Sequence, residues 1–269
     1  MVKKIAIIGA GNIGLSLAKG LIASKKYTAK AITLTKRTLS QNDTIKKHNL
    51  NFTTNNIEAV KKNQIIIIAV LPQQLNLVLD EIKDYLNPKQ HIIVSVVSGA
   101  SSKDIAKHIG KKIAIIRTMP NTAIAIRQSM TCMASDNTSK ENLELVKSIF
   151  DTVGETILIH EEMMTSATAL NACGIAFFLR AIRAASQGGV EIGFHAEDAL
   201  RMAVQTAKGA ADLLLLNHSH PENEIDKVTS PKGCTIAGLN EMEHAGFSSA
   251  LIKGIRISAK KAEELYCEE

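Results

Sequence analysis

Short apolar runs rich in β-branched residues alternate with amphipathic stretches through the first part of the chain, up to about residue 160. Runs of this length are typical of buried strands, and helical periodicity between them is typical of amphipathic helices. We expect strands at 4–8, 31–34, 50–53, 64–70, 91–97, 112–117, 130–134 and 154–159. We expect helices directly after residue 14 and at 40–48, 56–62, 73–85, 101–108 and 139–150. This alternation predicts an α/β fold with a mostly parallel, doubly wound sheet of the Rossmann type, with 154–159 as an edge strand.

The second part of the chain has a different pattern, with long helical stretches at 162–190, 196–217, 235–245 and 247–267 and no strand. We therefore predict two domains, over 1–160 and over 161–269, with a hinge within 155–163 and an all-α C-terminal domain. The stretch 162–190 is apolar around most of its circumference. Because such a helix needs partners on all sides, we expect a second copy of the chain to pack there, in a homodimer or a larger homo-oligomer.

The composition and charge of the chain narrow its choice of partners. Its 269 residues carry a formal net charge of +6 from scattered lysines, and only 3% of them are aromatic. Without a basic run or a stacking platform, nucleic acid is not expected, whereas the charge suits the attraction of small anionic ligands. The longest uninterrupted apolar runs, such as 65–71, are too short to span a bilayer, and no leader cleavage site is evident. We therefore expect no membrane association and a cytoplasmic location.

The cysteines do not suggest a metal site. Cys132, Cys173, Cys234 and Cys267 lie far apart and show no metal-ligand spacing. Neither a bound metal nor a disulfide framework is expected.

A glycine-rich turn follows the first predicted strand and opens a helix. Gly9, Gly11 and Gly14 have the GxGxxG spacing of dinucleotide-binding turns. In such a turn the first glycine permits a tight bend, the second lets the backbone approach a pyrophosphate, and the third allows the helix to pack closely on the strand. The order of strand, turn and helix predicts a dinucleotide site here.

The choice of dinucleotide is read at the end of the second strand, where NAD sites carry an acidic residue. This chain has Thr35, Lys36, Arg37 and Thr38 at that place. Cations flanked by hydroxyls can hold a 2′-phosphate through charge-assisted hydrogen bonds, so we predict NADP(H) rather than NAD(H). An ordinary basic surface turn is the alternative. Two more loops at predicted strand ends, 69–72 and 117–122, could line the crevice for the nicotinamide ring.

A turn near the C-terminus has the features of an anion site. Ser230 and Thr235 flank Pro231 and Gly233, directly before a predicted helix that starts near Thr235. The first amides of a helix have no partners within it and attract negative charge, so two hydroxyls beside them would suit a carboxylate. A plain capped helix after a turn is the alternative reading.

These segments resemble the Δ1-pyrroline-5-carboxylate reductase family over essentially the whole chain. The resemblance runs through GAGNIG (9–14), TKRT (35–38), AVLPQ (69–73), RTMPNT (117–122), TALNACG (168–174), AVQT (203–206) and DKVTSPKGCTIAGL (226–239). It implies an N-terminal NADP-binding Rossmann domain, a helical substrate and dimerisation domain, and reduction of the cyclic imine 1-pyrroline-5-carboxylate to L-proline by NADPH.

The resemblance also implies site residues. Ser230, Thr235 and the amides of Gly233 and Cys234 would bind the substrate carboxylate, and Thr168 would face the ring nitrogen in the catalytic step. Together with the residues predicted from the glycine turn and from the basic turn, the expected cofactor contacts are Ile8, Gly9, Ala10, Gly11, Asn12, Ile13, Gly14, Thr35, Lys36, Arg37, Asn56, Ala69, Val70, Leu71, Pro72 and Asn121.

The chain departs from the family pattern at three places, one of which is His218, where some relatives have a carboxylate near the substrate. Residues 171–177 read NACGIAF where the family typically has SGSGPAY, and Leu71 stands at a position where the family carries a lysine. A non-catalytic NADP-binding relative is therefore one alternative. A β-hydroxyacid-type dehydrogenase is another, but that chemistry needs a general base, commonly a lysine on the long helix. Residues 162–190 contain Arg180 and Arg183 and no lysine.

Overall fold

The computed structural model of the chain describes residues 3–37, 50–110 and 112–266. They form two compact units, one of Met1–Cys173 with Ile257–Glu269 and one of Gly174–Arg256. The predicted helix over 40–48, together with Thr38 and Cys267, lies outside the described residues.

The first unit is built on a sheet of eight strands in the order β3-β2-β1-β4-β5-β6-β7-β8. The strands are β1 Ile5–Ile8, β2 Ile32–Thr35, β3 Asn51–Thr53, β4 Ile65–Ile68, β5 Ile92–Ser95, β6 Ala114–Met119, β7 Ser129–Ala134 and β8 Gly154–Leu158. All neighbours are parallel except β6 and β7. The link from β6 to β7 is only a short 3-10 helix, η4 (Thr122–Ile126), which is too short for a parallel crossover. The sequence expectation of a mostly parallel, doubly wound sheet is confirmed.

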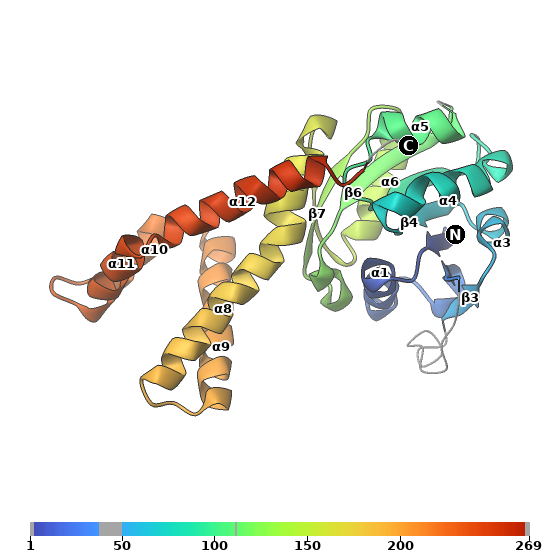
Figure 1. The fold of residues 1–269 in the computed structure, drawn as a ribbon. Coiled ribbons are helices and arrows are strands. Elements are labelled where there is room, and N and C mark those ends of the chain that lie inside the picture. Colours follow the sequence, from blue (N-terminus) through green and yellow to red (C-terminus); the bar gives the residue numbers. More distant parts are fainter. Residues whose placement is uncertain (1–2, 38–49, 111, 267–269) are drawn as a thin grey trace. The chain divides into compact units, whose positions relative to one another are not determined.

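Helices cover both faces of this sheet (Figure 1). One core joins alternate strand residues such as Ile5 and Ile7 to α1 (Asn12–Ala23) and α6 (Lys140–Phe150). The other joins Ala6 and Ile8 to α3 (Asn56–Lys62), α4 (Leu75–Ile82) and α5 (Ser102–Ile109). Successive side chains of a strand point to opposite faces, so a continuous apolar run such as β1 fills both cores. Short 3-10 helices η1 (Ala29–Ala31), η2 (Pro72–Gln74) and η3 (Lys83–Tyr85) complete the connections.

The helical stretch after the sheet begins inside the first unit. It consists of η5 (Glu161–Met163), α7 (Met164–Ala167) and η6 (Thr168–Cys173), the last a π-helical turn. Met164 and Ala167 are buried against Met119 and Cys132 of the sheet. The C-terminus returns to the same unit, where the hydroxyl of Tyr266 donates to Oδ1 of Asn76 at 2.8 Å. The compact units therefore divide the chain after Cys173 and again before Ile257, whereas the sequence suggested one division near residue 160.

The second unit contains α8 (Gly174–Glu191), α9 (Ala196–Asn217), α10 (Pro221–Val228), α11 (Cys234–His244) and the first part of α12 (Phe247–Glu263). Helix α8 packs on α9, with Gly189 over the buried Ala199. Every residue of 174–256 is described, and only Gly174, Ser186 and Ala199 among them are buried. Phe178, Leu179, Leu215 and Leu216 are all more than half exposed. This unit has almost no core of its own.

Helix α10 was not expected from the sequence. It has only eight residues, most of them polar, so its apolar residues Ile225 and Val228 are too few to mark a helix, although Pro221 at its first turn and His220 as its N-cap are helix-start signals. The ring nitrogen Nδ1 of His220 accepts from the amide of Glu222 at 3.3 Å, which gives this histidine a capping role.

Among the described residues, one helical stretch, Glu161–Glu191, is long and apolar enough to cross a bilayer by length and composition alone. It is the stretch for which the sequence predicts a second copy of the chain as partner.

Candidate cofactor site

The glycine turn after β1 has the geometry that a pyrophosphate cradle requires. Gly9 has φ +103°, and a Cβ atom there would lie 2.5 Å from the carbonyl oxygen of Ala69. A Cβ on Gly14 would lie 2.0 Å from the carbonyl oxygen of Gly9, so this glycine permits the close packing of α1 on the turn. By contrast, no atom beyond the adjacent residues lies within 4 Å of a Cβ built on Gly11. The turn is thus crowded on its inner side and open at Gly11, where a ligand can approach the backbone.

Thr35 at the end of β2 holds this turn in place. Its carbonyl oxygen accepts from the amide of Ala10 at 2.9 Å, and its hydroxyl oxygen accepts a longer bond of 3.4 Å from the amide of Gly9. Thr35 is buried, with 2% of its surface exposed. Helix α1 then starts at Asn12 with Gly11 as its N-cap and with no acidic residue in its first turn, so its first amides face no carboxylate of their own helix.

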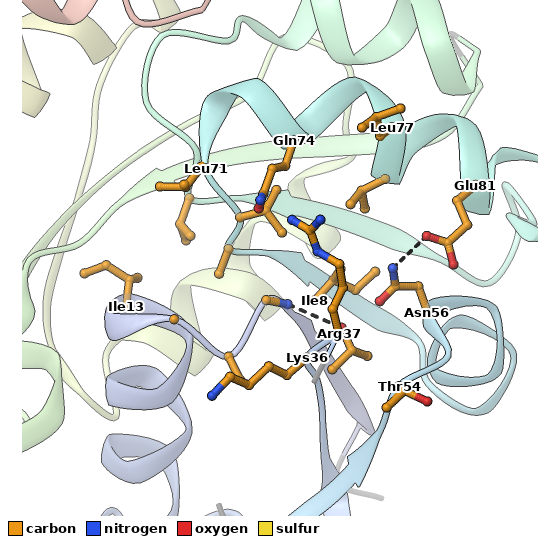
Figure 2. Close-up of a pocket in the computed structure, with 18 of the residues that line it drawn as sticks. Ile8, Ile13, Lys36, Arg37, Thr54, Asn56, Leu71, Gln74, Leu77 and Glu81 are labelled. Carbon is orange, nitrogen blue, oxygen red and sulfur yellow. Dashed lines mark hydrogen bonds between the residues drawn. The ribbon is translucent and has the colours of Figure 1, made fainter. Parts of the chain in front are cut away.

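A cavity of about 980 Å³ opens beside the turn at the carboxyl ends of β1, β2 and β4 (Figure 2). Thirteen of the sixteen expected cofactor residues line it, namely Ile8, Gly9, Ala10, Gly11, Asn12, Ile13, Thr35, Lys36, Arg37, Asn56, Ala69, Val70 and Leu71. Lys36 and Arg37 give its β2 end a basic character. Leu71, at the position where the family pattern has lysine, is 64% exposed and lends the cavity an apolar wall.

Helix α4 supplies a wall that sequence reasoning missed. Gln74, Leu77, Val78 and Glu81 line the cavity together with Thr54 and Val96. The four residues of the α4 region recur at helical spacing in a stripe next to Leu75, Leu79 and Ile82, which are buried in the core. The exposed face of the predicted helix 73–85 was therefore the signal that could have found them. Asn56 of α3 contacts this wall, since its Nδ2 donates to Oε2 of Glu81 at 2.8 Å.

Three expected cofactor residues do not line the cavity. Gly14 lies beneath the turn, and Pro72 begins η2. The side chain of Asn121 is engaged elsewhere, since its Oδ1 accepts from the amide of Ala123 at 3.0 Å and its Nδ2 donates to Oδ1 of Asn171 at 2.9 Å. Asn171 in turn donates to the carbonyl oxygen of Met119 at the end of β6. Asn171, which departs from the family pattern, thus ties the π-helical turn to the loop after β6.

Thr168 is 4% exposed, and its hydroxyl donates to the carbonyl oxygen of Met164 at 2.9 Å. This is the back-bonded arrangement common for threonine in helices. Because the proton is used in that bond, the hydroxyl oxygen can act toward a ligand only as an acceptor.

Ser230 and Thr235 flank a turn in the second unit, as the sequence predicts. The amide of Gly233 donates to the carbonyl oxygen of Ser230 at 2.9 Å, and a Cβ on Gly233 would lie 2.5 Å from the Ser230 hydroxyl oxygen. Gly233 is the N-cap of α11, no side chain caps this helix, and its first turn has no acidic residue. Helix α11 starts at Cys234, one residue before the predicted place. The turn therefore offers amides and hydroxyls without a competing carboxylate from the helix.

Two family models and several known proteins are similar to this chain. A family model described as pyrroline-5-carboxylate reductase dimerisation matches residues 161–265, and one described as NADP oxidoreductase, coenzyme F420-dependent, matches residues 4–99. Pyrroline-5-carboxylate reductase 2 of Dictyostelium discoideum is 51% identical over 276 residues, which cover 97% of this chain and 92% of that protein. The chain belongs to the pyrroline-5-carboxylate reductase family. The resemblance stated from the sequence motifs is thus confirmed.

Two further comparisons define the extent of the match. Pyrroline-5-carboxylate reductase 1 of Dictyostelium discoideum is 55% identical over 98% of this chain, but the chain spans only 50% of that protein's length. The solved structure of a pyrroline-5-carboxylate reductase from Coxiella burnetii superposes with a TM-score of 0.89 at 28% identity, over 100% of both chains. The reductase fold therefore accounts for the whole of this chain.

Proposed function

We propose that the protein is an NADP-dependent pyrroline-5-carboxylate reductase, which reduces the cyclic imine 1-pyrroline-5-carboxylate to L-proline in the last step of proline biosynthesis. The observation that carries this proposal is the cavity at the carboxyl ends of β1, β2 and β4, with an open glycine turn and with Lys36 and Arg37 at one end. Family membership supplies the substrate class.

The residues of the cavity fit NADP(H). The opening at Gly11 and the first amides of α1 suit the pyrophosphate, and the cations of Lys36 and Arg37 suit the 2′-phosphate. NADPH supplies the hydride when it is bound. The contribution of the chain is to hold the dinucleotide and the imine in register, since an iminium carbon accepts hydride without a nucleophile or a base from the protein.

Two groups of residues are proposed to hold the substrate. Ser230, Thr235 and the amide of Cys234 would bind its carboxylate, because the uncapped start of α11 attracts an anion. The amide of Gly233, which the sequence also assigned to this carboxylate, instead closes the turn by donating to the carbonyl oxygen of Ser230. Thr168 would accept a hydrogen bond from the protonated ring nitrogen, since its own proton is given to Met164. That bond favours the iminium, which is the form that receives hydride.

We also infer that the protein works as a homodimer or a larger homo-oligomer through its helical part. The second unit buries few of its own residues, and the matching family model is described as a dimerisation region. We infer that a second copy of the chain, and not a membrane, covers the apolar stretch Glu161–Glu191. The compartment in which the protein works stays a prediction from the sequence.

A coupled assay tests the reaction. NADPH oxidation is measured with 1-pyrroline-5-carboxylate, and NADP reduction is measured with a panel of 2-hydroxy and 3-hydroxy acids. Turnover on the imine alone supports the proposal. Turnover on a hydroxy acid would instead identify a dehydrogenase, and tight NADPH binding without any turnover would identify a non-catalytic relative.

The carboxylate turn can be tested by a paired variant. Ser230→Ala with Thr235→Ala should raise KM for the imine by about 30-fold or more, because each lost charge-assisted bond is worth about 1 to 2 kcal/mol. KM for NADPH should stay within about twofold of the wild type, because neither hydroxyl lines the cavity. Thr229→Ala is a matched control, since its hydroxyl donates to the carbonyl oxygen of Asp226 at 3.1 Å. An unchanged imine KM in the double variant would rule out this turn as the carboxylate site.

A further inference from the structure

An acidic side chain reaches the same cavity as the basic turn after β2. Glu81 lies on the exposed face of α4 and lines the cavity with Lys36, Arg37 and Asn56. In the sequence it is far from the end of the second strand, where an NAD-type acidic residue is sought. The tertiary fold brings it there, because α3 and α4 both pack on the face of the sheet to which Ala6, Ile8, Ile66 and Ile68 point.

The hydrogen bond between Asn56 and Glu81 fixes how this corner can treat a ligand. A carboxylate only accepts hydrogen bonds, so the amide NH₂ group of Asn56 must face Glu81. In Figure 2 the nitrogen of Asn56 points to Glu81, and its oxygen lies on the other side, toward Arg37. The oxygen of Asn56 and the carboxylate of Glu81 are therefore acceptors at this corner, and one of the two N–H groups of Asn56 is used within the pair. An acceptor can bind a ribose hydroxyl but cannot bind a phosphate, which has no proton to give near neutral pH.

The two walls of the cavity consequently favour different dinucleotides. Lys36 and Arg37 attract the 2′-phosphate of NADPH, whereas the charge of Glu81 opposes a phosphate dianion and its carboxylate engages one N–H of the Asn56 amide. The ribose hydroxyl of NADH meets no such opposition. Resting on the proposed function, we propose that Glu81 is a specificity-determining residue that moderates the preference for NADPH and keeps NADH usable.

Substitutions at Glu81 separate its charge from its hydrogen bond. Glu81→Gln removes the charge and keeps a partner for Asn56, and Glu81→Ala removes both. The ratio of kcat/KM for NADPH to that for NADH should rise about five- to tenfold in Glu81→Gln, because an exposed charge some ångströms from a dianion is partly screened by solvent. The rise in Glu81→Ala should be at least as large. It should shrink when the same assays are run at 0.5 M salt, since screening weakens a Coulombic effect.

Asp80 provides a matched control on the neighbouring position of α4. Its carboxylate pairs with Lys83 at 3.1 Å and with His108 at 3.2 Å, and it does not line the cavity. Asp80→Asn makes the same change in net charge, and the cofactor ratio should stay within about twofold of the wild type. An equal rise in Asp80→Asn and Glu81→Gln would overturn the proposal, because the effect would then belong to the net charge of the chain. Lys36→Ala with Arg37→Asp should shift the ratio in the opposite direction.

Binding of adenosine nucleotides gives a readout that does not depend on imine reduction. Calorimetry of the full chain with adenosine 2′,5′-bisphosphate and with adenosine 5′-monophosphate measures the value of the 2′-phosphate alone. The affinity ratio should rise in Glu81→Gln by the same factor as the kinetic ratio, and an unchanged or lower ratio would overturn the proposal. Nucleotide binding without imine turnover would contradict the proposed reaction and would still decide the role of Glu81. If neither nucleotide binds, the cofactor site and this inference both fall.

Discussion

At the scale of single residues, Gly11 and Gly14 have different roles in one turn, the first in ligand approach and the second in helix packing. A Cβ on Gly14 would collide with the carbonyl oxygen of Gly9, whereas a Cβ on Gly11 would meet no atom within 4 Å beyond its adjacent residues. The first glycine beyond the bend thus serves the ligand, and the last one serves the packing of α1. These are the roles that the GxGxxG pattern predicts for its second and third glycines.

This difference predicts opposite outcomes for two alanine variants. Gly14→Ala should lower Tm strongly, because the backbone of the turn must move to admit a methyl group. Gly11→Ala should leave Tm of the ligand-free protein within about 2 °C of the wild type. It should nevertheless weaken NADPH binding about tenfold or more, because the methyl group stands where the pyrophosphate approaches. Thermal unfolding with and without NADPH measures both effects, and equal losses of Tm without ligand would contradict this division.

His91 is a buried residue outside the site whose protonation should affect stability. Its Nδ1 accepts from the amide of Asn87 at 2.9 Å, and its Nε2 is buried. Burial lowers the pKa of the His91 imidazole, an effect that the carbonyl of Val60 partly offsets. The folded chain therefore prefers the neutral ring. Its stability contribution is fully present above the unfolded pKa of about 6.5 and is lost as the pH falls below that value toward the folded pKa.

We expect the free energy of unfolding to fall below pH 6.5 with a slope of up to about 1.4 kcal/mol per pH unit from this residue. His91→Gln should flatten that slope, because glutamine does not titrate. His195→Gln, at an exposed N-cap, is the control and should keep the slope of the wild type. Urea titrations at pH 7.5, 6.5 and 5.5 measure this. Parallel slopes for the wild type and His91→Gln would assign the acid sensitivity to other groups.

At the scale of elements, a buried ion pair joins three segments at the start of the helical stretch. Nη1 of Arg117 on β6 donates to Oε1 of Glu161 at 3.0 Å. The amide and the hydroxyl of Ser102, at the first turn of α5, donate to the same carboxylate at 2.9 and 3.1 Å. The Arg117 side chain is 5% exposed. Arg117 of the RTMPNT segment is thus occupied with anchoring η5.

Removing one partner of this pair should be costly. Glu161→Ala is expected to lower the free energy of unfolding by about 3 to 5 kcal/mol, because the Arg117 charge is left buried without its counter-ion. Arg117→Met in that background should recover part of the loss, since it removes the unpaired charge. Urea unfolding of the two variants measures this. A loss below about 0.5 kcal/mol in the single variant would show that the pair contributes nothing measurable.

At the scale of the whole molecule, the second unit needs a partner surface. Helix α9 carries a polar stripe of Arg201, Gln205, Lys208 and Asp212, and beside it an apolar stripe of Leu200, Val204, Ala207, Ala211 and Leu215, each at three- to four-residue spacing. Leu215 is 64% exposed within one chain. Few residues of 174–256 are buried, so association has to supply the core that this unit lacks.

Leu215→Lys should therefore weaken association by placing a charge in the apolar stripe, by about 2 kcal/mol or more. Gln205→Lys adds the same charge to the polar stripe of the same helix and should leave the assembly intact. Light scattering after size-exclusion chromatography, over a range of protein concentrations, measures the oligomeric state. A monomeric wild type, or equal dissociation of both variants, would contradict the expectation.

The sequence by itself determined the order of strands and helices through most of the chain, because local periodicity reports which residues face a core. The glycine turn, the basic turn after β2 and the turn at Ser230 were predicted for the same reason, since each is a contiguous segment with its own backbone chemistry. Helix α10 was missed because it is short and mostly polar, with too few apolar residues to establish a periodicity.

Only the tertiary structure decided which distant side chains meet. Glu81 joins Asn56 in the cofactor cavity, Asn171 joins Asn121 at the loop after β6, and Glu161 joins Arg117 and Ser102. None of these contacts follows from spacing along the chain, because each depends on the order of strands in the sheet and on the rotation of helices upon it. The sequence also did not indicate that β7 runs antiparallel to β6, since a strand's own residues do not encode its direction relative to its neighbours. The chain thus carries its cofactor motif locally, whereas the balance of charge around that cofactor arises only when α4 is packed beside α3.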